Sequence, residues 1–165
     1  LAIARRLRPP TAGVEATLLD RQPAIAPSTI DAFKAIGWTV KIESDDVFAW
    51  AQRAGEFDVI LANLFLHHFP DNELKTLFGH LAARTKLFLA CEPRRAVWPL
   101  GVSRLIGLIG CNDVTRHDAV ISVRAGFRGS ELSTLWGHDA SWQRHEAATG
   151  LFSHGFTATR SDNLA

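Results

Sequence analysis

Residues 57–74 have the sequence FDVILANLFLHHFPDNEL, and this stretch decides the fold. Its first part, 57–66, is almost continuously apolar, which is typical of a strand covered on both faces of a sheet. A polar step follows, and we expect Asp71 to cap a helix that extends to about Ala83. The stretch therefore predicts a buried parallel strand followed by a helix.

Apolar segments of strand length alternate with helix-like segments on both sides of this stretch. Further strands are predicted at 14–19, 38–43, 86–91, 142–148 and 156–160. Helices are predicted from Pro27 to Gly37 with Ser28 as the cap, at 47–53, near 100–109 and at 130–136, and another ends within 1–8. This alternation predicts an α/β fold with a mainly parallel sheet, helices on both faces and a closing antiparallel hairpin.

Length and composition fit one domain over residues 1–165. The chain begins at Leu1 and contains no methionine, so we expect a fragment or a processed product. No apolar run approaches the roughly 18 residues of a membrane span, so no membrane association is expected. The formal net charge is +1 with dispersed arginines, which argues against nucleic-acid binding. Two cysteines, Cys91 and Cys111, favour a cytoplasmic setting with reduced thiols, and metal-ligand spacing is lacking.

Polar residues follow several of the predicted strands, where ligands of open α/β sheets bind. Asp20 follows the strand at 14–19, and its two carboxylate oxygens match the vicinal hydroxyls of a ribose. A solvated strand-end aspartate is the equally weighted alternative. Asp45 and Asp46 follow the next strand, where one carboxylate could accept a hydrogen bond from an adenine amino group while the other caps the next helix. Asp46 is favoured for the ligand.

Three segments carry a resemblance to a known family. The segment at 57–74 resembles the fourth-strand motif of class I S-adenosylmethionine-dependent methyltransferases of the ubiquinone/menaquinone-biosynthesis type, with its aspartate, apolar run and Leu-His-His step. LFLACEPRR at 87–95 resembles the strand that follows, and NDVTRHDAVISVRAGFRGSEL at 112–132 is similar to the substrate-facing region. The resemblance covers nearly the whole chain and implies a Rossmann-like fold and a small-molecule methyltransferase.

The resemblance also implies roles for individual residues. Asp20 would bind the ribose of S-adenosylmethionine and Asp46 the adenine, while Asn63 and Leu64 would lie beside the methionine moiety and the methyl group. The family's first strand and its glycine-rich cofactor loop would precede Leu1 and are missing from this sequence. Cofactor binding by this chain alone is therefore placed in doubt.

Histidine and arginine side chains supply the candidates for catalysis and substrate binding. His117, between Arg116 and Asp118, is the favoured general base, and His68 is the second candidate. The alternative for His67 and His68 is structural, with one ring packed at the sheet edge and the other bonded to the next loop. Arg94 and Arg116 are candidate substrate ligands, and an ion pair between Arg94 and Glu92 is the favoured alternative for that pair. Large aromatic side chains are expected to pack in the core or a lid: Phe65, Trp98, Phe127 and Trp136.

The predicted reaction is an in-line methyl transfer to a small, apolar or aromatic acceptor, in which the protein aligns the reactants and excludes water. A nicotinamide-dependent oxidoreductase would share the early βαβ layout, but the sequence has no tyrosine and so lacks a Tyr-x-x-x-Lys pair. A methyltransferase-like domain without catalytic activity is the other alternative, and the missing glycine loop favours it. The sequence gives no prediction of the oligomeric state.

Overall fold

The computed structural model describes residues 13–22, 25–95 and 126–163. The chain divides into two compact units, Leu1–Ala54 and Gly55–Ala165. The expectation of a single domain over residues 1–165 stays a prediction. The helices expected within 1–8 and 100–109 lie outside the described residues. In the described part, no helix is long and apolar enough to cross a membrane.

The first unit is a βαβ arrangement followed by a helix. Its elements are β1 (Val14–Asp20), α2 (Pro27–Lys34), β2 (Trp38–Ser44) and α3 (Val47–Arg53). The strands β1 and β2 are parallel and pair in register from Val14 with Trp38 to Asp20 with Ser44. Their carboxyl ends therefore lie side by side, which brings Asp20 close to the residues that follow β2. The strands and helices predicted between residues 14 and 53 are confirmed, with α2 ending at Lys34 rather than at Gly37.

Two helices have cap residues that differ from the expectation. In α2, Pro27 is the first helical residue and Ala26 precedes it, so Ser28 lies inside the first turn and caps nothing. Proline suits this position because its missing N–H would have had no partner there. In α4 (Asp71–Ala82), Pro70 takes the cap position and Asp71 lies in the first turn. Asp71 is therefore no cap, although its charge complements the helix dipole.

The second unit contains one sheet, with both parallel and antiparallel strands, and several helices. Its elements are β3 (Phe57–Asn63), the short helix η1 (Leu66–His68), α4, β4 (Thr85–Pro93), α7 (Glu131–Trp136), β5 (Trp142–Ala148), β6 (Ser153–Arg160) and η3 (Ser161–Asn163). The strand order is β3-β4-β6-β5. The pair β3/β4 is parallel, and β6 is antiparallel to both β4 and β5. The predicted closing hairpin is confirmed, and β6 begins three residues earlier than expected.

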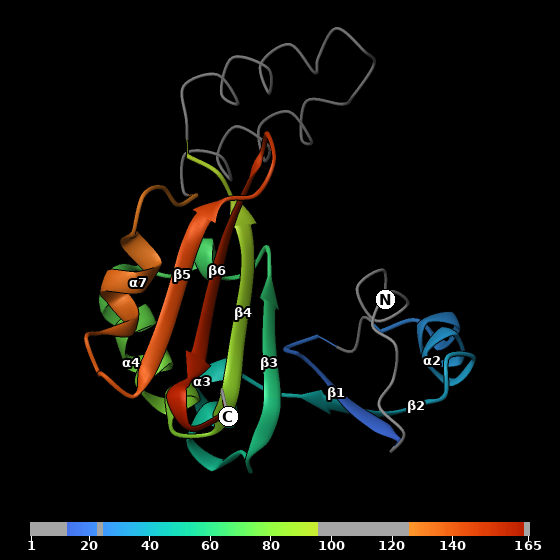
Figure 1. The fold of residues 1–165 in the computed structure, drawn as a ribbon. Coiled ribbons are helices and arrows are strands. Elements are labelled where there is room, and N and C mark those ends of the chain that lie inside the picture. The colour runs from blue at the N-terminus through green and yellow to red at the C-terminus, as the bar shows by residue number, and fades with distance from the viewer. Residues whose placement is uncertain (1–12, 23–24, 96–125, 164–165) are drawn as a thin grey trace, which may run out of the picture. The chain divides into compact units, whose positions relative to one another are not determined.

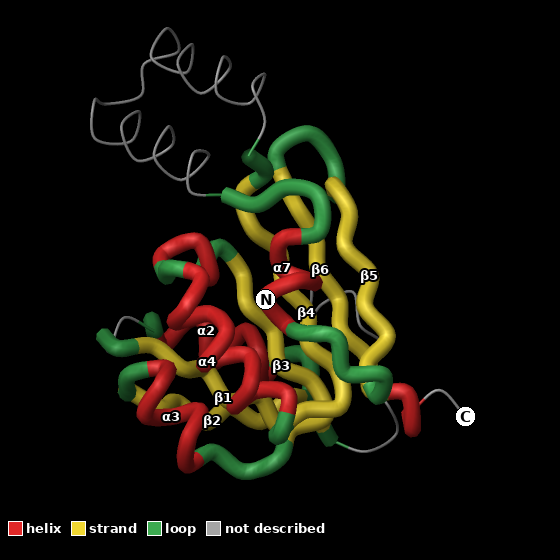
Figure 2. Tube along the Cα trace, turned by 90° about the vertical axis from the view of Figure 1, so that its left-hand side faces the viewer, coloured by secondary structure: helices red, strands yellow, loops and turns green. Residues whose placement is uncertain are grey.

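The core of this unit lies between the sheet and the helices α4 and α7, which lie on the same side of the strands (Figures 1 and 2). Phe78 of α4, Phe88 of β4 and Phe156 of β6 are all at most 1% exposed. The rings of Phe78 and Phe88 have centroids 5.6 Å apart, and Trp136 of α7 stacks on Phe88 at 5.0 Å. The predicted packing role of Trp136 is confirmed, as is that of Phe127, which is 6% exposed.

The strand β3 is less buried than expected. Val59 is 49% and Leu61 47% exposed, whereas Ile60 and Ala62, which face the helices, are more buried. The strand also ends at Asn63, and Leu66 belongs to η1. The expectation that β3 is covered on both faces is therefore wrong for the described residues. Among the described strands β3 pairs with β4 alone, and β1 with β2 alone, so each has one edge without a described partner.

Candidate functional site

In the first unit the candidate site lies at the paired carboxyl ends of β1 and β2. Asp20 is exposed, and its Oδ1 accepts a hydrogen bond from the backbone N–H of Gln22 at 2.9 Å. The backbone N–H of Asp45 donates to the carbonyl oxygen of Asp20 at 3.2 Å. The two parallel strands thus bring Asp20 and the Asp45-Asp46 pair to one edge of this small sheet, as the sequence predicted.

Asp45 and Asp46 have different partners. Oδ1 of Asp46 accepts hydrogen bonds from the backbone N–H groups of Phe48 (2.9 Å) and Ala49 (3.3 Å), so Asp46 caps α3. Asp45 forms an ion pair with Arg53, and its Oδ1 accepts from the N–H of Asp46 at 2.8 Å. The hydrogen bond from Arg53, aided by that from Asp46, holds the pKa of Asp45 below its ordinary value. Both hydrogen bonds to the Asp46 side chain use Oδ1, whereas Oδ2 accepts none from the described residues.

We expect Asp46→Ala to lower the free energy of unfolding by about 1 kcal/mol, because α3 loses the acceptor for two of its first N–H groups. Asp46→Asn is the matched control, since asparagine caps helices about as well as aspartate. Urea denaturation followed by circular dichroism measures both. Equal stability of the alanine variant and the unchanged chain would contradict the capping role.

In the second unit the candidate site lies at the carboxyl end of β3. Leu64 has a φ of +52°, the left-handed region that side-chain-bearing residues rarely adopt. Such a conformation costs about 1–2 kcal/mol and is retained only where the surroundings impose it. The N–H of Leu64 donates to the carbonyl oxygen of Cys91 on β4 at 2.9 Å, and the Leu64 side chain is 55% exposed. Asn63 and Leu64 therefore form an exposed, constrained turn over the end of the parallel pair β3/β4.

A buried carboxylate holds the residues that follow this turn. Glu92 is fully buried, and its Oε1 accepts from the backbone N–H groups of Phe65 (2.9 Å) and Leu66 (3.0 Å). Its Oε2 accepts from the backbone N–H of His67 at 3.4 Å and lies 2.8 Å from Nδ1 of the same residue. The expected ion pair of Glu92 with Arg94 is therefore wrong, because both oxygens are directed at the loop after β3.

The two neighbouring histidines differ in exposure. The His67 side chain is 5% exposed and pairs with Glu92, whereas His68 is exposed, with its ring centroid 4.1 Å from that of His67. The structural role considered for the two histidines therefore fits His67, whereas His68 is exposed to solvent. Phe65, expected to pack in the core, is 36% exposed and contacts Phe69 edge to face.

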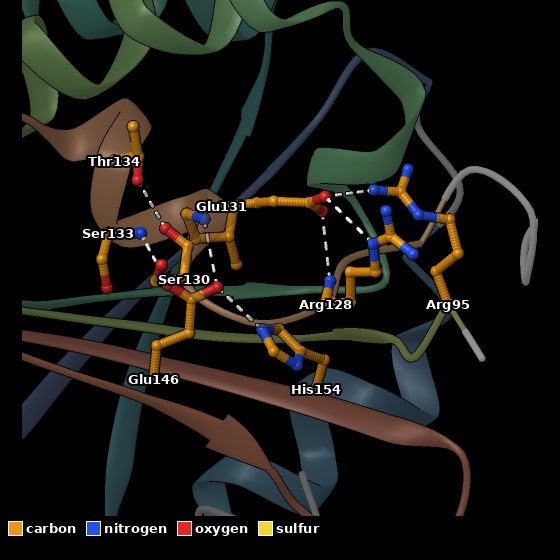
Figure 3. A network of polar contacts seen from close by, with 9 residues as sticks. Arg95, Arg128, Ser130, Glu131, Ser133, Thr134, Glu146 and His154 are labelled. Atoms are coloured by element: carbon orange, nitrogen blue, oxygen red, sulfur yellow. Dashed lines mark hydrogen bonds and ion pairs between the residues drawn. The ribbon is translucent and has the colours of Figure 1, made fainter.

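A second buried carboxylate lies on the hairpin, and sequence reasoning missed it (Figure 3). Glu146 of β5 accepts from the backbone N–H groups of Leu132 (3.1 Å) and Ser133 (2.7 Å) at the start of α7 and lies 2.7 Å from Nε2 of His154. Burial alone would raise the pKa of Glu146, but the hydrogen bonds from His154, Ser133 and Leu132 outweigh burial and lower it. The signal available in the sequence was the polar His154 at the same alternation as the apolar Phe156 and Ala158 of β6.

The end of β4 and the residues just before α7 lie next to each other. Arg94 forms a parallel bridge with Phe127, and its N–H donates to the carbonyl oxygen of Phe152 at 2.8 Å. Arg95 and Arg128 both pair with Glu131 (Figure 3). Arg94, a candidate substrate ligand, is thereby fixed at the carboxyl end of β4. The other two candidates on this part of the chain lie outside the described residues: Arg116 and His117.

The described residues contain no group of three His, Cys, Asp or Glu side chains that could hold a metal ion. They do contain two sets of polar groups at carboxyl ends of parallel strands, one in each unit. This is the edge at which open α/β sheets bind ligands.

The first unit contains a βαβ unit, and the second contains a parallel pair of strands extended by an antiparallel hairpin; both are α/β arrangements of the Rossmann-like kind. Solved structures match this fold over most of the chain. No family model and no curated protein matches the sequence.

The matching structures include several methyltransferases. The plantazolicin methyltransferase BpumL in complex with SAH gives a TM-score of 0.62 at 11% identity, over 87% of this chain and 66% of that one. Magnesium protoporphyrin IX methyltransferase from Synechocystis PCC 6803 with bound SAH gives 0.51 at 17% identity, over 81% and 57%. The N-methyltransferase NodS from Bradyrhizobium japonicum WM9 in complex with SAH gives 0.53 at 12%, over 87% and 65%. This chain thus spans between 57% and 66% of the length of each of these proteins, less than two thirds.

Proposed function

We propose that this chain is part of an S-adenosylmethionine-dependent methyltransferase acting on a small molecule. The observation that carries the proposal is the placement of polar, constrained residues at the carboxyl ends of parallel strands in a methyltransferase fold. Methyltransferases with that fold bind S-adenosylhomocysteine. The ubiquinone/menaquinone-biosynthesis type remains the proposed subtype, on the resemblance of residues 57–74.

The described residues fit the cofactor. Asp20 is exposed at its strand end, and its carboxylate accepts one hydrogen bond, from the N–H of Gln22 to Oδ1, so it can also accept from the two ribose hydroxyls. Asp46 can cap α3 with Oδ1 and accept from the adenine amino group with Oδ2. Asn63 and Leu64, which are both exposed, would lie along the methionine end. When bound, S-adenosylmethionine supplies a methyl group on a positively charged sulfur.

We also propose that the complete polypeptide has a strand and a glycine-rich loop before Leu1. The support is that β1 and β3 each have one edge without a described partner, where a further parallel strand could pair with them. A helix start after such a loop would bind the polar end of the ligand through backbone N–H groups.

The remaining roles concern the acceptor. His117 is the proposed general base and His68 the second candidate; His68 faces solvent at the same end of the sheet as Asn63. Arg94 and Arg116 are the proposed acceptor ligands, and the apolar segment near 100–109 favours an apolar or aromatic acceptor. The contribution of the protein is mainly alignment and exclusion of water, because in-line displacement requires the acceptor atom behind the methyl group.

Calorimetric titration with S-adenosylhomocysteine tests the proposal, using this chain and the full-length polypeptide that its gene encodes. We expect the full-length polypeptide to bind, and Asp20→Ala to weaken binding by about tenfold to a hundredfold, because a ribose loses hydrogen bonds to a charged acceptor. Glu15→Ala is the matched control, since Glu15 is exposed on the same strand but far from its carboxyl end.

Two results would count against the proposal in different ways. An absence of binding by the full-length polypeptide would overturn the cofactor assignment and favour a methyltransferase-like domain without activity. Equal weakening by Asp20→Ala and Glu15→Ala would overturn the role of Asp20 while leaving cofactor binding in place. Binding by the full-length polypeptide and not by this chain would support the glycine loop before Leu1.

A further inference from the structure

Glu92 accepts hydrogen bonds from several groups of the loop that follows β3. Three consecutive backbone N–H groups, those of Phe65, Leu66 and His67, point at its two oxygens, and the His67 ring is the fourth group. Consecutive N–H groups converging on one anion form the concave arrangement that proteins use to hold negative charge. Here the anion is the protein's own side chain, and it is fully buried.

The geometry of this loop decides where Asn63 and Leu64 lie. The N–H of Leu64 is bonded to Cys91, and the next three residues are bonded to Glu92, so every residue from Leu64 to His67 is attached to the end of β4. The left-handed Leu64 at the start of this run is the conformation that needs such support. If the hydrogen bonds to Glu92 are lost, we expect the Leu64 backbone to return to a conformation with negative φ.

We propose that Glu92, with His67 as its partner, is a positioning residue that holds Asn63 and Leu64 in the geometry required at the methyl end of the cofactor. The proposal rests on the proposed function, because it assigns the held turn to cofactor binding. Glu92 is fully buried, whereas Leu64 is 55% exposed, so the turn and not the carboxylate is open to a ligand. Its negative charge is required because four donors must find acceptors on one side chain, which only a carboxylate supplies.

Glu92→Gln is the test variant, because glutamine keeps the shape and replaces one acceptor oxygen with an N–H₂ group that faces the loop's own donors. Glu146→Gln is the matched control, since Glu146 is a second buried carboxylate that holds two backbone N–H groups and a histidine away from this loop. Both variants lose a buried charge. Only the first is expected to change the turn.

Two measurements are made on each variant of the full-length polypeptide. Hydrogen exchange by NMR is expected to show faster exchange of the Phe65 and Leu66 amides in Glu92→Gln alone. Titration with S-adenosylhomocysteine is expected to show affinity reduced at least about tenfold, about 1.4 kcal/mol, in Glu92→Gln and unchanged in Glu146→Gln. Thermal unfolding of both variants checks that each remains folded at the titration temperature.

The possible outcomes separate this inference from the proposed function. Failure of the unchanged polypeptide to bind S-adenosylhomocysteine overturns the proposed function, and this inference with it. Binding that is equally strong with and without Glu92→Gln overturns the inference alone. An equal loss of affinity in both glutamine variants also overturns it, because the effect would then follow from general destabilisation. If Glu92→Gln does not fold, Glu92→Asp takes its place: its shorter side chain keeps the charge but reaches the loop less well, and unchanged exchange at Phe65 and Leu66 would overturn the inference.

Discussion

Replacing Phe88 with alanine is expected to lower the free energy of unfolding by about 3–5 kcal/mol. Phe88 is 0% exposed, and its ring lies against those of Phe78, Trp136 and Phe156, at centroid distances of 5.6, 5.0 and 6.1 Å. Truncation leaves a cavity at the point where α4, α7 and two strands meet, and rigid rings around it cannot collapse into the space. Guanidinium denaturation monitored by tryptophan fluorescence measures the loss.

Phe152→Ala is the matched control for Phe88→Ala, because the same atoms are removed from a side chain that is 46% exposed at the tip of the β5/β6 hairpin. The control is expected to lose about 1 kcal/mol or less, in proportion to the smaller apolar area withdrawn from water. Similar losses in the two variants would contradict the placement of Phe88 at the centre of the core.

Glu146→Gln is expected to lower the free energy of unfolding at pH 7 by about 1–3 kcal/mol, because it leaves two backbone N–H groups and the His154 ring with one acceptor oxygen fewer. The side chains of His154 and Glu146 are 3% and 2% exposed. The pKa of Glu146 is lowered below the ordinary 4.5 in the folded chain, so the charged form contributes stability above pH 4.5. That contribution is lost as the pH falls through the lowered folded pKa.

The stabilities of the unchanged chain and Glu146→Gln should therefore approach one another as the pH is lowered from 7 to below about 4. Urea denaturation at a series of pH values gives both curves, and comparing the two cancels the titration of the other carboxylates. A difference between the curves that stays constant with pH, or that grows as the pH falls, would contradict the assignment of a lowered pKa to Glu146.

Much of the fold could be predicted because its signals are local. The bounds of α3 and β5 were predicted to the residue, since apolar periodicity and the flanking polar residues define both ends. The cap of α2 was missed because proline at the first helical position moves the start one residue before Ser28. The exposure of β3 was missed because burial depends on neighbours that one strand's own sequence does not specify.

The candidate site was predictable only in part. Strand ends locate Asp20, Asp46 and Asn63, because parallel strands place their carboxyl ends at one edge. The role of Glu92 was not accessible, since its partners lie 25 to 27 residues earlier and Arg94 offered a nearer partner of opposite charge. The pairing of Glu146 with His154 likewise depends on the register of two antiparallel strands and on the position of α7.

We propose that S-adenosylmethionine or its product is bound by Asp20 and Asp46 in the first unit and by Asn63 and Leu64 in the second. The most direct measurement is an NMR titration of the isotope-labelled full-length polypeptide with S-adenosylhomocysteine. We predict shifts of the amide signals of Asp20, Asp46, Asn63 and Leu64, with Val14 and Thr85, at the opposite ends of their strands, unchanged. Absence of shifts at a saturating ligand concentration, or shifts confined to the Val14 and Thr85 ends, would contradict the account.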